Sequence, residues 1–152
     1  MSKPVFGSFG GACPGDLFAS RQELALRGQH RPLRSGVCGT AALGTESIVL
    51  ADEYEDDEIH DDYFWYAGRG GRHPKTGQQV ADQHLDARNR PLARSAETGG
   101  PVRVFRRIAD SPADWQFRYE GLWHVVESEY VVGISDFLVW RFRFEPWRKP
   151  AS

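Results

Sequence analysis

Cysteine is scarce in this sequence, with two residues, Cys13 and Cys38, among 152. Neither belongs to a CxxC pair or has a histidine-rich neighbour, so the sequence indicates neither a zinc site nor a disulfide framework. The histidines also lack the spacing of metal ligands. We therefore predict no metal and no cofactor.

Long apolar runs are also absent. No stretch approaches the ~20 apolar residues that a bilayer-spanning helix needs. The opening residues, MSKPVFGSFGG, lack the apolar core of a signal peptide. We expect a cytoplasmic protein with no membrane partner, and a chain of 152 residues is the usual length of one domain.

A generally basic composition is missing as well, because the formal net charge is −2. The charge is unevenly distributed along the chain. Residues 51–62 contain eight acids and no Lys or Arg, whereas residues 63–152 contain fourteen Lys or Arg and ten acids. A nucleic-acid partner therefore requires an explanation for this acidic segment, since carboxylates near phosphate are repulsive.

Several segments are rich in Val, Ile, Phe, Trp and Tyr, which favours strands. We expect strands at residues 47–54, 63–68, 101–108, 121–132 and 136–144. Helices are expected after Asp16, ending at Gly28, and near residues 82–89, before a turn at Arg90 and Pro91. The fold class is α+β, with a curved or barrel-like, mostly antiparallel sheet and a few short helices packed outside it.

The acidic segment lies between two tyrosines, Tyr54 and Tyr66, each at the end of an expected strand. Several carboxylates close together could hold a divalent metal for phosphodiester chemistry, or they could form a solvated turn. The tyrosines could be ordinary core or surface aromatics, which are common at strand ends. Two facing aromatic rings would instead form a slot for a flat base, and a carboxylate in that slot can accept hydrogen bonds from the exocyclic amine of cytosine.

The next segment, GRGGRHPKTGQQ at 68–79, is rich in glycine and basic residues. Such a loop can pass close to phosphates, with Arg69, Arg72 and Lys75 neutralising their charge, or it can be a flexible surface loop. It contains no GxxxxGK[ST] phosphate-binding motif.

Seven segments in order resemble one family: HRPLRSGVCG, SIVLADEYEDD, YAGRGGR, TGQQVADQ, GGPVRVFR, RYEGLWHV and FLVWRF. The chain is similar, from about residue 6 to residue 144, to the SRA or YDG domains, which bind modified cytosine in DNA. The resemblance implies a single PUA-like domain that flips 5-methylcytosine, or 5-hydroxymethylcytosine, out of duplex DNA.

The resemblance also implies site residues. Tyr54 and Tyr66 match the aromatics that sandwich the base, and Asp57 matches the carboxylate that reads its Watson–Crick edge. The remaining base-pocket groups are the carbonyl of Ala67 and the main-chain N–H groups around Ala51, Asp52 and Glu53. The residues expected to contact DNA are Arg34, Ser35, Arg69, Gly70, Gly71, Arg72, Lys75, Gln78 and Gln79.

The chain departs from the family pattern at Asp52 and Glu53, where many members have glycines, and at Tyr119–Glu120–Gly121, which replaces the name-giving tripeptide. Its compact loop after the glycines resembles bacterial members, which are often fused to an HNH-type nuclease in modification-dependent restriction. We expect a recognition domain without catalysis, paired with a nuclease domain or subunit. The alternatives are a metal-dependent nuclease that uses the acidic cluster and a PUA-like module that binds RNA.

Overall fold

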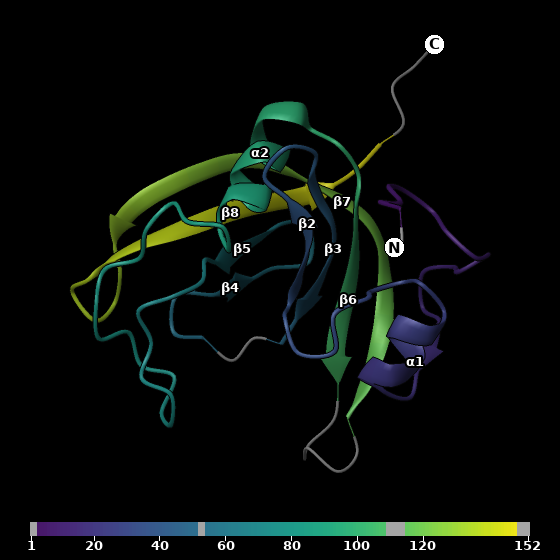
Figure 1. Cartoon of the computed structure of the whole chain (residues 1–152), viewed down its shortest axis with the longest axis horizontal. Coiled ribbons are helices and arrows are strands. Elements are labelled where there is room, and N and C mark those ends of the chain that lie inside the picture. The colour runs from purple at the N-terminus through teal and green to yellow at the C-terminus, as the bar shows by residue number, and fades with distance from the viewer. Residues whose placement is uncertain (1–2, 52–53, 109–114, 149–152) are drawn as a thin grey trace.

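A computed structural model describes residues 3–51, 54–108 and 115–148. Eight strands form one curved sheet with two helices outside it (Figure 1). The strands are β1 Leu17–Phe18, β2 Val37–Thr40, β3 Gly44–Leu50, β4 Glu58–Ile59, β5 Phe64–Ala67, β6 Val102–Ile108, β7 Gln116–Val132 and β8 Leu138–Pro146. The helices are α1 Arg21–Leu26 and α2 Arg90–Thr98.

The sheet is mixed and does not close into a barrel. Its strand order is β2-β3-β6-β7-β8-β5-β4, and β1 pairs with β7. Among the described strands only β3 and β6 run parallel, and every other pairing is antiparallel. The predicted class, a curved and mostly antiparallel sheet with outer helices, is confirmed, and the sheet is open.

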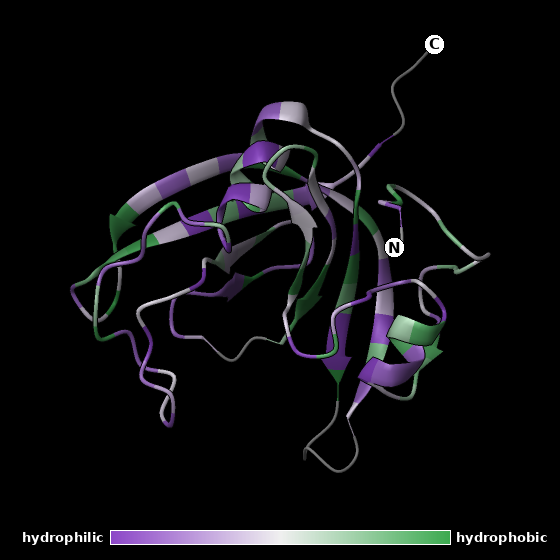
Figure 2. Ribbon diagram, viewed as in Figure 1, coloured by the Kyte–Doolittle hydropathy of each residue, from purple (hydrophilic) through white to green (hydrophobic). Residues whose placement is uncertain are grey.

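Both faces of the central strands β3 and β6 are covered. Ile48 and Leu50 belong to one core cluster and Val49 to another, and neighbouring side chains on a strand point to opposite faces. Helix α2 packs against β3 and β7 over the first cluster, while the second cluster includes Leu24 of α1. Bands of hydrophilic and hydrophobic residues alternate along β7 (Figure 2), as expected for a strand with one face toward a core.

Both helix predictions were wrong: the first in its start, and the second in its place, because residues 82–89 form no helix. The first helix begins after Ser20, whose side chain accepts a hydrogen bond from Glu23 N–H at 3.1 Å, whereas Asp16 accepts one from Cys13 N–H. The second helix begins at Arg90, where the sequence predicted a turn, because proline is tolerated in the first turn of a helix. In the described part of the chain, neither helix has the length and apolar character needed to cross a membrane.

Candidate nucleic-acid interface

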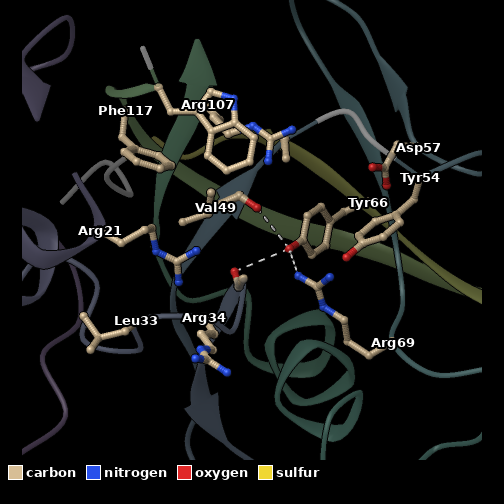
Figure 3. Close-up of a pocket in the computed structure, with 13 residues that line it drawn as sticks. Arg21, Leu33, Arg34, Val49, Tyr54, Asp57, Tyr66, Arg69, Arg107 and Phe117 are labelled. Carbon is tan, nitrogen blue, oxygen red and sulfur yellow. Dashed lines mark hydrogen bonds between the residues drawn. The ribbon is translucent and has the colours of Figure 1, made fainter. Parts of the chain in front are cut away.

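A cavity of about 340 Å³ opens beside the ends of β3 and β5 (Figure 3). Its walls come from α1, the loop before β2, the loop after β3, and the facing ends of β6 and β7. Four predicted base-pocket residues line it: Ala51, Tyr54, Asp57 and Tyr66. The other lining residues are Arg21, Leu33, Arg34, Gly36, Val49, Arg69, Arg107, Trp115 and Phe117.

The Asp57 carboxylate is held at the wall of this cavity. Its Oδ1 accepts a hydrogen bond of 2.8 Å from Ala67 N–H, at the end of β5. Burial raises the pKa of Asp57 to about 6, although hydrogen bonds from the N–H groups of Ala67 and Tyr54 and the charges of Arg72 and Arg69 oppose that rise. The result is a fixed acceptor that is ionised at neutral pH and neutral in mild acid.

Tyr66 contributes a ring that packs into the core from β5. Only 2% of the residue is exposed, and the ring lies edge-on to Phe144, with centroids 6.0 Å apart. Its hydroxyl lies 3.2 Å from the Val49 carbonyl oxygen and 3.4 Å from that of Gly36, and it accepts a hydrogen bond from Arg69. Burial raises the pKa of Tyr66 to about 12, so the hydroxyl stays protonated.

Tyr54 lies opposite, on the loop after β3, and is half-buried. The Arg72 guanidinium carbon lies 3.7 Å from the centroid of the Tyr54 ring, and that of Arg69 lies 5.5 Å from it. Arg72 does not line the cavity whereas Tyr54 does, so we infer that Arg72 supports the ring from the side away from the cavity. Arg72, a predicted phosphate contact, stacks on Tyr54 in this structure without DNA.

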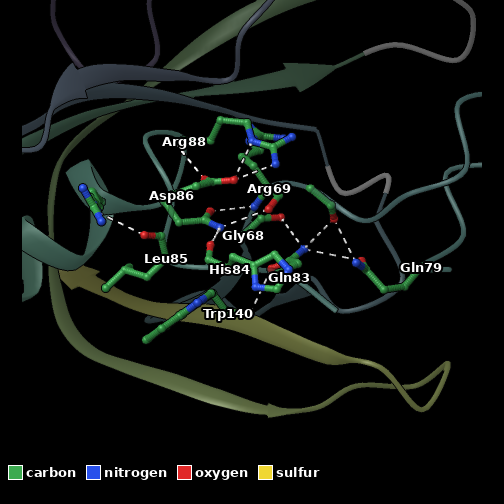
Figure 4. A network of polar contacts seen from close by, with 12 residues as sticks. Gly68, Arg69, Gln79, Gln83, His84, Leu85, Asp86, Arg88 and Trp140 are labelled. Atoms are coloured by element: carbon green, nitrogen blue, oxygen red, sulfur yellow. Dashed lines mark hydrogen bonds and ion pairs between the residues drawn. The ribbon is translucent and has the colours of Figure 1, made fainter. Parts of the chain in front are cut away.

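The glycine segment, residues 68–71, is held in place by the side chain of Gln83, a residue that is only 1% exposed (Figure 4). Its side-chain Nε2 lies 3.0 Å from the Gly68 carbonyl oxygen and 3.3 Å from that of Gly70. Its Oε1 accepts a hydrogen bond of 2.9 Å from Trp140 N–H in β8. One buried amide therefore ties the loop to the sheet.

Asn89 and Gln79 complete this support. Asn89 accepts a hydrogen bond from Arg69 N–H at 2.7 Å and donates one to the Arg69 carbonyl at 3.0 Å. Gln79, predicted as a DNA contact, is only 1% exposed and donates to the carbonyls of Gly70 and Ala81. The side chain of Gln79 is therefore structural here, because both of those bonds hold the loop in place.

A family model described as the SAD/SRA domain matches residues 5–149 of this chain. The chain belongs to the SAD/SRA family. The family resemblance seen in the sequence is thus confirmed, and the open curved sheet is the PUA-like fold of SRA domains.

Curated relatives come from animals and plants. The chain is 35% identical over 176 residues to the E3 ubiquitin-protein ligase UHRF1 of Bos taurus, covering 95% of this chain and 22% of that protein. It is 34% identical over 145 residues to the E3 ubiquitin-protein ligase ORTHRUS 1 of Arabidopsis thaliana, covering 88% and 23%. This SRA domain therefore spans about a fifth of the length of these relatives.

Two solved structures are informative. The SUVH5 SRA domain bound to fully hydroxymethylated CG DNA matches with a TM-score of 0.81 at 31% identity, covering 97% of both chains. The modification-dependent TagI restriction endonuclease matches with a TM-score of 0.85 at 34% identity, covering 98% of this chain and 54% of that chain.

Of the other predicted DNA contacts of this SRA domain, Arg34 lines the cavity. Arg34 and Ser35 are exposed on the loop before β2, and Lys75 and Gln78 lie on the loop after β5. The positive φ angles of Gly70 and Gly71, 102° and 68°, favour glycine at both positions. The expected roles of Asp52 and Glu53 fall outside the described residues.

The acidic side chains described in residues 54–62 do not converge on one point. Asp56 is buried and accepts a hydrogen bond of 3.0 Å from Ile134 N–H in the β7–β8 turn, while Glu58 pairs with Arg141. Within the described ranges, no three His, Cys, Asp or Glu side chains are arranged to hold a metal ion. Among the described acids of this segment, Asp57 lines the pocket with the two tyrosines.

Several cavity residues were missed by the sequence reasoning. Arg107, near the end of β6, stacks on Trp115, just before β7, with the guanidinium carbon 3.8 Å from the centroid of the ring. Arg21 donates hydrogen bonds to the carbonyls of Pro32 and Ser35 from α1. Arg107 could have been found if the strand at 101–108 had been predicted to pair with residues 115–123. No sequence pattern around Arg21 indicates that it lines the cavity.

Proposed function

We propose that this SRA domain binds duplex DNA containing 5-methylcytosine or 5-hydroxymethylcytosine and flips that base into the cavity between Tyr54 and Tyr66. The observation that carries the proposal is the Asp57 carboxylate, fixed by Ala67 N–H at 2.8 Å beside the two rings. A flipped base needs ring faces on which to stack and a partner for its Watson–Crick edge.

Asp57 supplies the discrimination between pyrimidines. An ionised carboxylate accepts a hydrogen bond from the exocyclic amine of cytosine, whereas the keto oxygen of thymine or uracil would face it without a donor. We propose that the Ala67 carbonyl accepts from the same amine. The main-chain N–H groups around Ala51, Asp52 and Glu53 would donate to the 2-keto oxygen.

The residues around the cavity would hold the duplex. Arg34, Ser35, Lys75 and Gln78 lie on two loops that flank the opening, as do the main-chain groups of Gly70 and Gly71. Cationic and hydrogen-bonding groups of this kind bind phosphates without reading sequence. The SUVH5 SRA structures, described as complexes with hemimethylated and hydroxymethylated CG DNA, support duplex DNA as the ligand.

We further propose that the domain is the non-catalytic reader of a modification-dependent restriction system. The likeness to TagI supports this, since that chain is a modification-dependent restriction endonuclease and this domain covers 54% of it. The nuclease would then be a separate domain or subunit. Bacterial origin and a cytoplasmic location stay predictions.

The test is a binding series on duplexes that differ only in the 5 position of one cytosine, carrying hydrogen, methyl or hydroxymethyl, at one stated salt concentration. We expect tighter binding of a modified duplex and no cleavage with Mg²⁺ or Mn²⁺. Equal affinity for all three duplexes, or preference for structured RNA as a competitor, would overturn the proposal. Cleavage by the isolated chain would favour the nuclease alternative instead.

A further inference from the structure

Tyr66 should offer a ring face to a flipped base, yet in the free domain it is only 2% exposed. One reason is the core beneath it, where Phe144 meets the ring edge-on. The other is Arg69, whose guanidinium carbon lies 5.2 Å from the Tyr66 ring centroid and 5.5 Å from that of Tyr54. The Arg69 guanidinium thus lies near both tyrosine rings between which a base would stack.

The Arg69 side chain sits at the hydroxyl ends of the two tyrosines and donates to the Tyr66 hydroxyl (Figure 3). Its Nε is buried and finds no hydrogen-bond partner among the described residues. Its backbone, in contrast, is fixed on both sides by the amide of Asn89. A move of the guanidinium would break its hydrogen bond to the Tyr66 hydroxyl but neither of these main-chain bonds.

Gly36 provides the room for this arrangement. A Cβ built on Gly36 would lie 2.1 Å from Arg69 Nη2 and 2.8 Å from the Tyr66 hydroxyl oxygen. Any side chain at position 36 would force the arginine out of its place across the rings. Gly36 does not have a positive φ, so alanine is sterically permitted by the backbone there.

We propose that Arg69 closes the base slot in the free domain and exchanges the Tyr66 hydroxyl for a phosphate of the flipped nucleotide when a base enters. This proposal rests on the proposed function. It adds that the Arg69 side chain has two positions, one on the Tyr66 hydroxyl in the free domain and one on a phosphate in the complex. A planar guanidinium has five donors in a geometry that suits phosphate oxygens, and the phosphates beside a flipped nucleotide pass the opening of the slot. The entering base and Arg69 therefore compete for the same space.

Two variants separate the closing role from the phosphate role. Arg69→Ala removes both the cover and the charge. Gly36→Ala keeps the charge but bars the closed position, with a small shift of the Tyr66 hydroxyl. Arg94→Ala is the matched control, because Arg94 lies on α2 away from the slot and pairs with Glu97.

The first measurement uses the free protein and needs no DNA. Hydroxyl-radical footprinting with peptide mapping reports the accessibility of Tyr66, with the exposed Tyr130 as an internal reference. We expect Tyr66 to be protected in the parent and in Arg94→Ala, and its oxidation to rise several-fold in Arg69→Ala and Gly36→Ala. Equal protection in all four proteins would overturn the closing role, whether or not the domain binds DNA.

The second measurement is the salt dependence of binding to a duplex with one 5-methylcytosine. Loss of one phosphate contact lowers the slope of log K against log salt by about 0.9. We expect that reduction in Arg69→Ala alone, with parental slopes in Gly36→Ala and Arg94→Ala. A parental slope in Arg69→Ala would overturn the phosphate role. A parent that does not prefer the modified duplex would instead refute the proposed function and leave the footprint to decide the closing role.

Discussion

The Asp57 carboxylate and the Ala67 peptide N–H, ten residues apart, are joined by a hydrogen bond of 2.8 Å. This bond fixes the acid that would read a base to the strand that carries Tyr66. The loop between them therefore cannot shift Asp57 without also breaking a contact of β5. The recognition group is rigid before any DNA arrives, which lowers the cost of ordering it on binding.

Binding should depend on pH through Asp57. Its pKa in the free domain is about 6, against 3.8 for an ordinary aspartate. An ionised carboxylate accepts hydrogen bonds more strongly than a neutral carboxyl, which carries a proton on one oxygen, so the affinity for a modified duplex should rise as pH increases from 5 to 7. Asp57→Asn should flatten this rise, and Asp57→Ala should lose cytosine-specific binding at a cost of ~1 to 3 kcal/mol. Anisotropy titrations in steps of half a pH unit measure both.

Asp57→Asn should stabilise the fold at neutral pH, although it weakens binding there. A raised carboxyl pKa means that the folded state binds the proton more tightly, so stability falls as pH rises from about 4 to about 6. The amide introduced by Asp57→Asn keeps an oxygen for Ala67 N–H and has no charge to bury. This variant should therefore melt at a higher temperature than the parent at pH 7. For the binding prediction, an affinity of the parent that falls with increasing pH would contradict the acceptor role of Asp57.

The two tyrosines should differ in what their hydroxyls do. Tyr54→Ala and Tyr66→Ala should each weaken binding by about 1 to 3 kcal/mol, roughly five- to two-hundred-fold, because a stacking face is lost. Tyr54→Phe should bind like the parent. Tyr66→Phe should bind but lose about 1 kcal/mol of stability, because its buried hydroxyl contacts Val49 and Arg69.

A fluorescent base checks the mechanism behind these affinities. A 2-aminopurine beside the modified cytosine should brighten on binding as its neighbour leaves the stack, and a mismatched modified cytosine should bind at least as well as a paired one. Melting curves show whether Tyr66→Ala is folded, since that ring is part of the core. Tight binding with a flat signal would contradict base flipping even if the alanine variants bind weakly.

The parts of this site that follow local rules could be predicted from the sequence. Alternation along residues 136–144 puts Leu138, Trp140, Phe142 and Phe144 on one face of a strand, and the last two of these are fully buried. Tyr54 and Tyr66 line one cavity, although β3 ends at Leu50 and Tyr54 lies on the loop after it and not at the expected strand end. Each of these inferences uses only neighbours in the chain and the geometry of a strand.

Polar residues that serve the interior could not be predicted in this way. Arg103 counted as one of the basic residues after the acidic segment, yet it is buried and bonds the carbonyls of Gln29 and Val5, 74 and 98 residues away. Gln79 was predicted as a DNA contact, yet its side chain is buried as well. Charge and polarity favour the surface unless distant backbone groups supply partners, and those partners appear only in the fold.

Gln83→Glu should weaken both fold and binding. The substitution keeps the shape and the acceptor for Trp140 N–H, but a carboxylate cannot donate to the Gly68 and Gly70 carbonyls. Two buried carbonyls would then face a buried charge, at a cost of ~1 to 3 kcal/mol or more. Chemical denaturation measures the loss. Gln78→Glu is the matched control, because it adds the same charge at an exposed position of the same loop.

The control matters because an added acid also repels phosphate. If Gln78→Glu weakens binding as much as Gln83→Glu does, then the charge and not the loop support explains the loss. If the Gln83 variant keeps parental stability, the buried amide does not hold the glycine segment in the way its contacts indicate.

His30 should make the domain sensitive to acid. It is fully buried between Ser47 and the loop that carries Arg34, and its Nε2 lies 2.8 Å from the Ser35 carbonyl oxygen while Nδ1 lies 2.7 Å from Ser47 Oγ. A carbonyl can only accept, so Nε2 carries the proton and Nδ1 accepts from the serine. Burial, only partly offset by the Ser35 hydrogen bond, lowers the pKa of His30 to about 3, so the ring stays neutral in the folded state.

The sign of the effect follows from linkage. The unfolded chain binds a proton at His30 near pH 6.5 and the folded chain only near pH 3, so stability is lost as pH falls through that interval, by up to about 1.4 kcal/mol for each pH unit. His30→Gln should be less stable at pH 7 yet show a shallower decline between pH 6 and 4. The exposed His84→Gln serves as the control and should track the parent. Because Asp57 changes stability in the opposite direction over part of this range, the comparison is the difference between each variant and the parent at every pH. A His30 variant whose decline parallels that of the parent would show that His30 titrates alike in the folded and unfolded chains.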